Sequence, residues 1–294
     1  MHRSGTSAAT ASLAALGIAT PSEVNPISAS RWNERGNFES RALKDLNDRL
    51  LFSLGGTWSG PPDLKPGWET DHTLDSRRDQ ARRSLAKLLP TRPVVWKDPR
   101  NCLTLPFWRT VVSPPAAAVF IYRDPLEVAR SLQAREDVTL TYGLALWDRY
   151  VRSASANLVG LPTMVADYAR ILQEPAAWMS DIAGYLGEIG VIVSPPRQPT
   201  AWLAAGLRHH NAPAESRPPL AKAQFEVLEA LRNHDGPHPA WLAPELGPEP
   251  SWVDDVLALR LQADKLRNTL NQAEQLSRNS RIFRITRRMG GLRR

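Results

Sequence analysis

Two features are nearly absent from this sequence of 294 residues: cysteine, present only as Cys102, and long apolar runs. A single cysteine excludes an internal disulfide and a thiolate cluster for zinc or for iron and sulfur, so we expect a reducing compartment, with the cytoplasm as the default. No apolar run reaches the roughly 18 residues that a membrane-spanning helix needs, so we expect no such helix. The sequence also lacks a Gly-x-Ser-x-Gly motif, which removes the usual anchor for serine hydrolase chemistry.

Acidic residues are missing from the segment 278–294, which carries the whole formal net charge of +7. The other 30 basic residues cancel the 30 acidic residues, so the body of the chain is neutral. Such a segment suits peripheral contact with the inner face of a membrane, binding of a polyanionic glycan, or a disordered tail. Nucleic acid ranks last, because no recognisable nucleic-acid fold accompanies the segment. Its arginines are Arg278, Arg281, Arg284, Arg287, Arg288, Arg293 and Arg294.

Short apolar runs alternate with amphipathic stretches over residues 1–194, which is typical of a parallel sheet with crossover helices. The helices are indicated by apolar residues spaced by four and three positions, and by a proline at a start and a glycine at an end. These patterns predict one domain over 1–194, with strands at 94–96, 117–122 and 163–166 and helices over 140–158 and 175–187.

The C-terminal third differs in composition. Residues 195–250 hold eleven prolines and predict an irregular connection with one short helix over about 222–231. Over 251–277, apolar residues recur in alternating steps of four and three, which predicts a helix with the seam of a coiled coil. This helix either packs on the body or pairs with a second copy of the chain, and the basic tail 278–294 follows it. The seam residues are Trp252, Val256, Leu259, Ala263, Leu266, Leu270 and Ala273.

The segment HRSGTS at residues 2–7 has the properties of a phosphate loop. Gly5 lets the backbone approach an anion closely, and the residues after it open a helix that ends near Gly17. A Walker loop requires a lysine after this glycine, but Thr6 stands there and the cation, Arg3, precedes it. The alternative interpretations are a Ser/Thr-capped helix and a secretory signal, the latter disfavoured by the few leucines that follow. The predicted phosphate-binding residues are Arg3, Ser4, Gly5, Thr6 and Ser7.

These patterns predict an α/β fold of the P-loop type, with three layers α/β/α around a parallel sheet, followed by a C-terminal helix and a basic tail. A phosphate loop needs a strand before it, because the strand fixes the direction of the loop and of its helix. The given sequence begins at the loop, so we expect that the first strand lies outside it. We expect about five to ten apolar residues upstream of Met1.

A second anion site is predicted where VFIYRDPLEVARSL turns from a strand into a helix. Asp124 is the expected N-cap, Pro125 the first helical residue, and Glu127 the partner in a capping box. Arg123 leaves the carboxyl end of the strand, and Ser131 falls on the same helix face as Asp124. Both phosphate sites then lie at the same edge of the sheet. The alternative is that Arg123 pairs with a surface acid and Ser131 is a solvated helix position.

Together these motifs resemble the sulfotransferase family. Its members bind the 5′-phosphosulfate of 3′-phosphoadenosine-5′-phosphosulfate (PAPS) with an Arg-Ser-Gly-Thr-[Ser/Thr] loop. They bind the 3′-phosphate with an arginine and a serine eight residues later, the spacing of Arg123 and Ser131. WNERGNFES, VVWKDPRNCLTLPFW and MVADYARILQEP are similar to segments of bacterial members, so the resemblance covers about residues 1–190. Lys97-Asp98-Pro99 is also similar to a segment of the tyrosylprotein branch.

The resemblance implies transfer of a sulfuryl group from PAPS to a hydroxyl or amine acceptor, by in-line displacement and without a required metal. Lys97 is the candidate that stabilises charge on the leaving oxygen; its alternative is a surface pair with Asp98. The acceptor needs a general base. We favour Glu39, which Phe38 can desolvate, over Glu34, and note that Glu39 could instead complement a helix dipole.

Several points stay open at this stage. His2 could contact the sulfate, whereas the histidines at 209–210, 234 and 238 lie in a loop region without clustered acids and predict no metal site. The acceptor is expected to be a small molecule or a glycan, and SRIFRITRRMGGLRR resembles endings found on glycan-modifying enzymes. The alternative functions are a P-loop phosphotransferase or kinase, and a catalytically silent protein that dimerises through 252–273 at a membrane.

Overall fold

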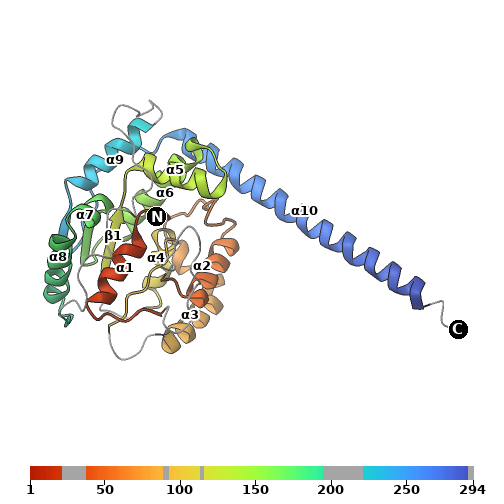
Figure 1. Ribbon diagram of the computed structural model, residues 1–294, viewed down its shortest axis with the longest axis horizontal. Helices are drawn as coiled ribbons and strands as arrows, with labels where there is room; N and C mark the ends of the chain where they lie inside the picture. The colour runs from red at the N-terminus through yellow and green to blue at the C-terminus, as the bar shows by residue number, and fades with distance from the viewer. Residues whose placement is uncertain (22–37, 89–92, 113–115, 195–220, 291–294) are drawn as a thin grey trace.

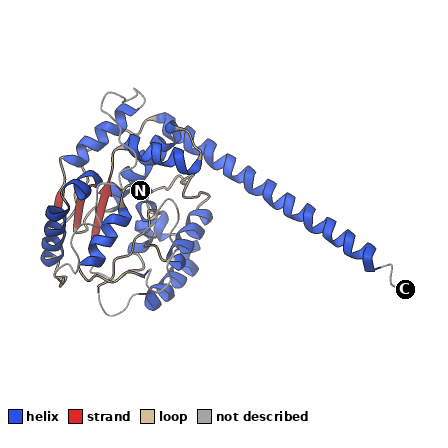
Figure 2. Ribbon diagram, viewed as in Figure 1, coloured by secondary structure: helices blue, strands red, loops and turns tan. Residues whose placement is uncertain are grey.

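The computed structural model describes residues 1–21, 38–88, 93–112, 116–194 and 221–290, with side chains in the last helix described as far as Arg278. Within these residues the chain forms a mixed α/β fold dominated by helices (Figures 1 and 2). In chain order the helices and strands are α1 (Thr6–Ala15), α2 (Arg41–Ser53), η2 (Trp68–Thr70), η3 (His72–Leu74), α3 (Asp75–Leu88), α4 (Asn101–Arg109), β1 (Ala118–Tyr122), α5 (Pro125–Glu136), α6 (Leu140–Asn157), β2 (Thr163–Asp167), α7 (Tyr168–Gln173), α8 (Pro175–Glu188), α9 (Lys222–Arg232), β3 (Gly236–His238) and α10 (Ser251–Gly290).

The described strands form one small sheet in the order β1-β2-β3. β1 and β2 are parallel, with Phe120 opposite Val165, and β3 runs antiparallel along β2. Successive side chains of a strand point to opposite faces. Phe120 and Val165 therefore join one apolar cluster, with α5, α6 and α9, while Ile121 and Met164 join another, with α1, α7 and α8. Helices cover both faces, which explains why the first two strands are almost entirely apolar.

The structure confirms the predicted strands at 117–122 and 163–166 and the helices over 140–158, 175–187 and 222–231, within a residue or two. The prediction of a purely parallel sheet is wrong, because β3 adds an antiparallel strand inside the segment expected to be irregular.

The predicted strand at 94–96 is also wrong. Among the described residues its only ladder contact is an isolated parallel bridge from Val94 to Ala19, with the Val95 amide donating to the Ala19 carbonyl over 2.9 Å. A β-branched apolar run becomes a strand only where a neighbouring strand offers several successive backbone partners. Here Ala19, which follows α1, is the one residue that bridges to this segment among the described residues, so residues 94–96 form no strand.

The last helix, α10, continues through the residues expected to form a separate tail and ends at Gly290. Its first turns pack on α6, where Val253 and Leu257 are buried, and the rest of the helix leaves the body (Figure 1). The arginine side chains beyond Arg278 lie outside the described residues. Among the described helices, none combines the length and the apolarity needed to cross a bilayer.

Candidate active site

The segment predicted to bind phosphate forms a tight bend that leads directly into α1. Arg3 and Gly5 both adopt left-handed backbone conformations, with φ angles of 65° and 81°. The carbonyl of Gly5 accepts from the amides of Ala8 and Ala9 and so starts the helix, and no side chain of the described residues caps it there. An uncapped helix start directs backbone donors and the positive end of the helix dipole toward a potential anion.

Arg123 lies beside this bend because of the sharp turn between β1 and α5. The side chain of Asp124 accepts hydrogen bonds from the amides of Leu126 and Glu127, which confirms it as the N-cap. The Arg123 carbonyl accepts from the indole of Trp147 over 2.9 Å, so the turn is fixed from both sides. Arg123 is buried, and its guanidinium donates to the Glu127 carboxylate over 2.8 Å and to the Arg3 carbonyl over 3.1 Å.

The two predicted phosphate sites meet at one contact. Arg3 Nε donates to Ser131 Oγ over 2.7 Å, across 128 positions of sequence. The sequence assigned Arg3 to the 5′ side of a nucleotide, yet its side chain reaches the serine assigned to the 3′ side. The acid that pairs with Arg123 is not on the surface, as the alternative supposed, because Glu127 is 2% exposed.

Tyr168 belongs to this cluster and was missed from the sequence. It is the first residue of α7, directly after β2, and its ring stacks under the Arg123 guanidinium at 4.9 Å. A Cβ added to Gly5 would lie 1.9 Å from the Tyr168 ring. The bare side of Gly5 therefore accommodates an aromatic ring, rather than an anion as expected. The position of Tyr168 after a strand was the signal available, since the carboxyl ends of parallel strands share one edge of the sheet.

We expect Gly5→Ala to destabilise the fold far more than Gly160→Ala, a matched control. Both glycines have a left-handed φ, of +81° and +82°, but a Cβ at Gly160 would meet nothing within 4 Å. The control should cost about 1–2 kcal/mol of backbone strain. Gly5→Ala should add about 1–3 kcal/mol for the clash with Tyr168. Urea unfolding of both variants measures the difference, and equal losses would show that Tyr168 yields without cost.

Two of the three predicted catalytic side chains, Glu39 and Lys97, form a largely buried ion pair. Lys97 Nζ and Glu39 Oε1 are 2.6 Å apart, and the side chains are 9% and 12% exposed. Lys97 thus does not pair with Asp98, which binds Arg100 instead. Glu39 is also not a first-turn acid, because it precedes Ser40, the N-cap of α2. The contact joins positions 58 residues apart.

A buried amide holds these two segments together. Asn47, on α2, donates to Asp98 and Asn101 over 2.9 and 3.0 Å. Its side-chain carbonyl accepts from Thr104 and Trp108, both over 2.8 Å. Every hydrogen-bonding position of the amide is therefore used, which makes the junction specific as well as stable. The network fixes α2 against residues 97–108 and so sets where Glu39 meets Lys97.

Comparisons with protein-family models, curated proteins and solved structures found no match to this chain.

The cluster around the bend carries an excess of positive charge. The pKa of Arg3 is lowered to about 10, mainly by burial and to a lesser degree by the nearby charges of Arg135 and Arg123. Burial, together with Arg100 and Arg135, also lowers the pKa of His2 well below its usual 6.5, so His2 is neutral at pH 7. Neighbouring cations destabilise each other's charged form, and an anion bound between them would stabilise it.

Two buried polar atoms in the bend have no hydrogen-bond partner among the described residues: His2 Nε2 and Ser4 Oγ. The ring of His2 lies against Trp58 at 4.7 Å and meets Tyr150 edge-on at 5.7 Å. Ser4 is completely buried. Leaving such atoms unpaired costs free energy, and a ligand that bonds them recovers it.

The remaining predicted site residues are Thr6 and Ser7, which form the start of α1, and Glu34. Glu34 and the histidines at 209–210 fall outside the described residues. His234 and His238 bond backbone carbonyls, and within the described part of the chain no group of three His, Cys, Asp or Glu side chains could hold a metal.

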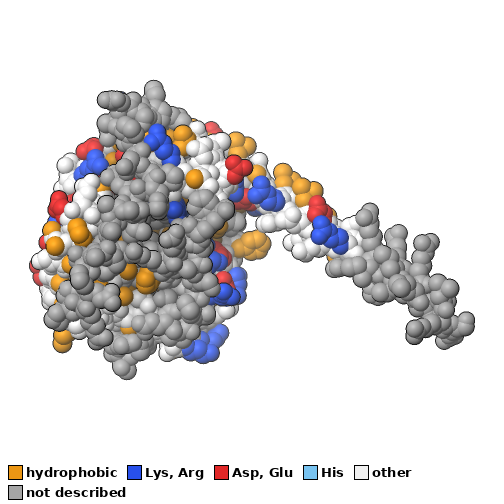
Figure 3. All heavy atoms as spheres, viewed as in Figure 1, with side chains coloured by type: hydrophobic (Ala, Val, Ile, Leu, Met, Phe, Trp, Pro, Cys, Tyr) orange, Lys and Arg blue, Asp and Glu red, His pale blue; other side chains and the backbone are white. Residues whose placement is uncertain are grey.

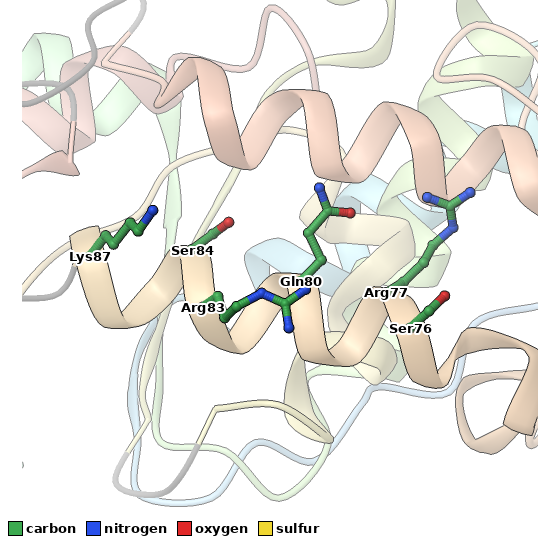
Figure 4. Close-up of a pocket in the computed structure, with 6 residues that line it drawn as sticks. All are labelled: Ser76, Arg77, Gln80, Arg83, Ser84 and Lys87. Atoms are coloured by element: carbon green, nitrogen blue, oxygen red, sulfur yellow. The ribbon is translucent and has the colours of Figure 1, made fainter.

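A hollow of about 500 Å³ opens on α3, which contributes none of the residues of the bend (Figure 4). Three cations of α3 line it, and none forms an ion pair within the described residues. It is an open basic surface without a buried polar group. The lining residues are Ser76, Arg77, Gln80, Arg83, Ser84 and Lys87.

Proposed function

We propose that this chain binds PAPS and transfers its sulfuryl group to an acceptor hydroxyl or amine. The observation that carries the proposal is the 2.7 Å contact between Arg3 and Ser131, with Arg123 bound to the Arg3 carbonyl. A nucleotide with phosphates at both the 3′ and the 5′ position requires two anion sites close together. The resemblance to sulfotransferases supplies the nucleotide, and the convergence of the two motifs supports it independently.

In this proposal two groups of residues bind different parts of the nucleotide. The amides of the bend and of the start of α1 bind the 5′-phosphosulfate, with His2 and Ser4 offering the polar atoms that lack partners. Arg123 and Ser131 bind the 3′-phosphate, and Arg3 spans both. The corresponding fold is the P-loop type with three layers α/β/α, for which the parallel pair β1–β2 and the helices on both of its faces are the supporting features.

The chemistry in this proposal uses the ion pair of Glu39 and Lys97. The acceptor oxygen or nitrogen forms a bond to sulfur while the bond between sulfur and the phosphate oxygen breaks, and the acceptor proton passes to Glu39. Lys97 stabilises the negative charge that grows on the departing phosphate oxygen, which remains with adenosine 3′,5′-bisphosphate. In the free protein the two groups neutralise each other at 2.6 Å. Binding of the nucleotide offers Lys97 a second anion, which leaves Glu39 available as a base.

The acceptor class follows from the resemblance alone, and we propose a glycan. A donor carrying labelled sulfate, tested against sugars and phenols, identifies the acceptor through the labelled product.

The nucleotide is tested by thermal stabilisation. Adenosine 3′,5′-bisphosphate at about 100 times its Kd should stabilise the folded chain by about 2.7 kcal/mol. ADP with magnesium should stabilise it much less, because it lacks the 3′-phosphate and because Thr6 replaces the Walker lysine. Equal stabilisation by both nucleotides would favour a phosphotransferase and overturn the proposal.

A further inference from the structure

From Leu259 onward α10 presents leucines to solvent, while Leu261 and Asp264 of the same stretch still contact the body. Leu259, Leu266 and Leu270 are 64–66% exposed. They lie along the part of the chain that projects from the body, where hydrophobic side chains follow the helix (Figure 3). Most helices in proteins are stabilised by packing of an apolar face rather than by helix propensity. The exposed leucines therefore mark an unpaired packing surface.

The apolar face is a regular seam. From Leu259, the apolar positions advance by four, three, four and three residues to Ala273, which is the repeat of a coiled coil. Two leucine positions stand at the centre, and an alanine flanks them on each side, which permits close approach of a second helix. We name these residues the α10 seam: Leu259, Ala263, Leu266, Leu270 and Ala273.

The body holds α10 by its opposite face. Val253 and Leu257 are buried on α6, and Leu261 packs on Gly60, where an added Cβ would lie 2.8 Å from Leu261 Cβ. Asp264 accepts from Ser59 Oγ over 2.7 Å. At about 100° per residue these positions point roughly 150° away from the seam. A helix from a second copy can thus approach the seam from the side of α10 that faces away from these contacts with the body.

Charge selects the orientation of that second helix. Residues 245–258 contain Glu245, Glu249, Asp254 and Asp255 and no lysine or arginine, and two of these acids, Glu249 and Asp254, also pair with Arg149 of the body. Residues 278–290 contain five arginines and no acid. Parallel pairing would align the arginine-rich ends of two copies, whereas antiparallel pairing places each beside an acidic segment and also opposes the helix dipoles.

We propose that the α10 seam binds a second copy of this chain as an antiparallel coiled-coil dimer. Leu266 of each copy packs against Leu270 of the other, and Ala263 faces Ala273 at both flanks. Residues 278–290 then run alongside residues 246–258 of the second copy. The two bodies lie on opposite sides of the helix pair. The dimer does not depend on the proposed activity.

The mass of the full-length chain in solution tests the dimer. Light scattering during size exclusion should give twice the chain mass for the wild type and a monomer for Leu266→Asp combined with Leu270→Asp, because two carboxylates cannot be buried in the seam. The control is Asn268→Asp combined with Gln275→Asp, which adds the same charge on exposed positions outside the seam and should remain dimeric. A monomeric wild type, or a seam variant that stays dimeric, would overturn the proposal. A monomer that binds anionic vesicles through the same leucines would overturn the dimer and indicate that the seam binds a membrane.

Cysteine cross-linking tests the orientation. A chain with Ala263→Cys and a chain with Ala273→Cys should form a disulfide when mixed and little when each is oxidised alone. Cross-linking of each variant with itself would indicate parallel pairing and overturn the antiparallel arrangement. The natural Cys102, which is partly buried in the body, serves as the background in the wild-type chain.

Discussion

Replacing Glu39 by glutamine is expected to lower the turnover of the sulfate donor by about 10²- to 10⁴-fold. Glutamine keeps the shape of the side chain and a hydrogen bond to Lys97, but it cannot take a proton from the acceptor. The acid limb of the kcat profile against pH should therefore disappear in the variant. Nucleotide binding should be retained, because Glu39 bonds Lys97 rather than Arg3, Arg123 or Ser131, and because the variant leaves Lys97 in place.

A purely structural ion pair would behave differently, and a double variant separates the two roles. If Glu39 serves only to neutralise Lys97, then Glu39→Gln with Lys97→Met should recover the stability and the activity lost in Glu39→Gln. If both groups act in the reaction, the double variant should be at least as inactive as either single one. Glu174→Gln, which changes an exposed acid near Arg170, is the control and should keep full activity. Recovery in the double variant would remove Glu39 from the mechanism.

The second large effect is expected at Arg123, as a change in nucleotide preference. Without its guanidinium, affinity for adenosine 3′,5′-bisphosphate should fall by about 100-fold, the value of one or two hydrogen bonds to a charged group. Affinity for 5′-AMP, which lacks the 3′-phosphate, should stay nearly unchanged. Titration calorimetry with both nucleotides measures the two constants.

Removing Arg123 alone would take from the buried Glu127 carboxylate the guanidinium that donates to it over 2.8 Å, at a cost of about 3–5 kcal/mol. The informative variant is therefore Arg123→Met with Glu127→Gln, compared with Glu127→Gln alone. The single variant keeps the guanidinium and should still bind the bisphosphate, whereas the double variant should not. A uniform loss for both nucleotides, or equal binding by the two variants, would place Arg123 outside the 3′-phosphate site.

The sequence predicted which segments would meet but not how their side chains would pair. The rule that strand ends share one edge of a sheet brought Arg123 near the N-terminal bend, and it would also have indicated Tyr168. It could not show that Arg3 reaches Ser131, because the rotamers of long side chains depend on what packs around them. Glu39 and Lys97 were each selected for a separate role. Their contact depends on Asn47, whose importance lies in four tertiary hydrogen bonds that leave no local pattern.

The wrong strand at 94–96 has a related cause. Val94, Val95 and Trp96 have the residue types of a strand, which is a local property, whereas a strand requires backbone partners on a neighbour. The antiparallel β3 was missed for the opposite reason. Its sequence, Gly-Pro-His, carries no strand signal, and β2 imposes the conformation.

Residues 58–60 connect the N-terminal bend with the first half of α10. Trp58 backs the ring of His2, Ser59 bonds Asp264 of α10, and Gly60 lies against Leu261 of the same helix. The same three residues therefore contact both α10 and the N-terminal bend. We therefore expect that a substitution that loosens α10 also reduces the packing against His2. The stability of the N-terminal bend is then expected to depend in part on the packing of the C-terminal helix.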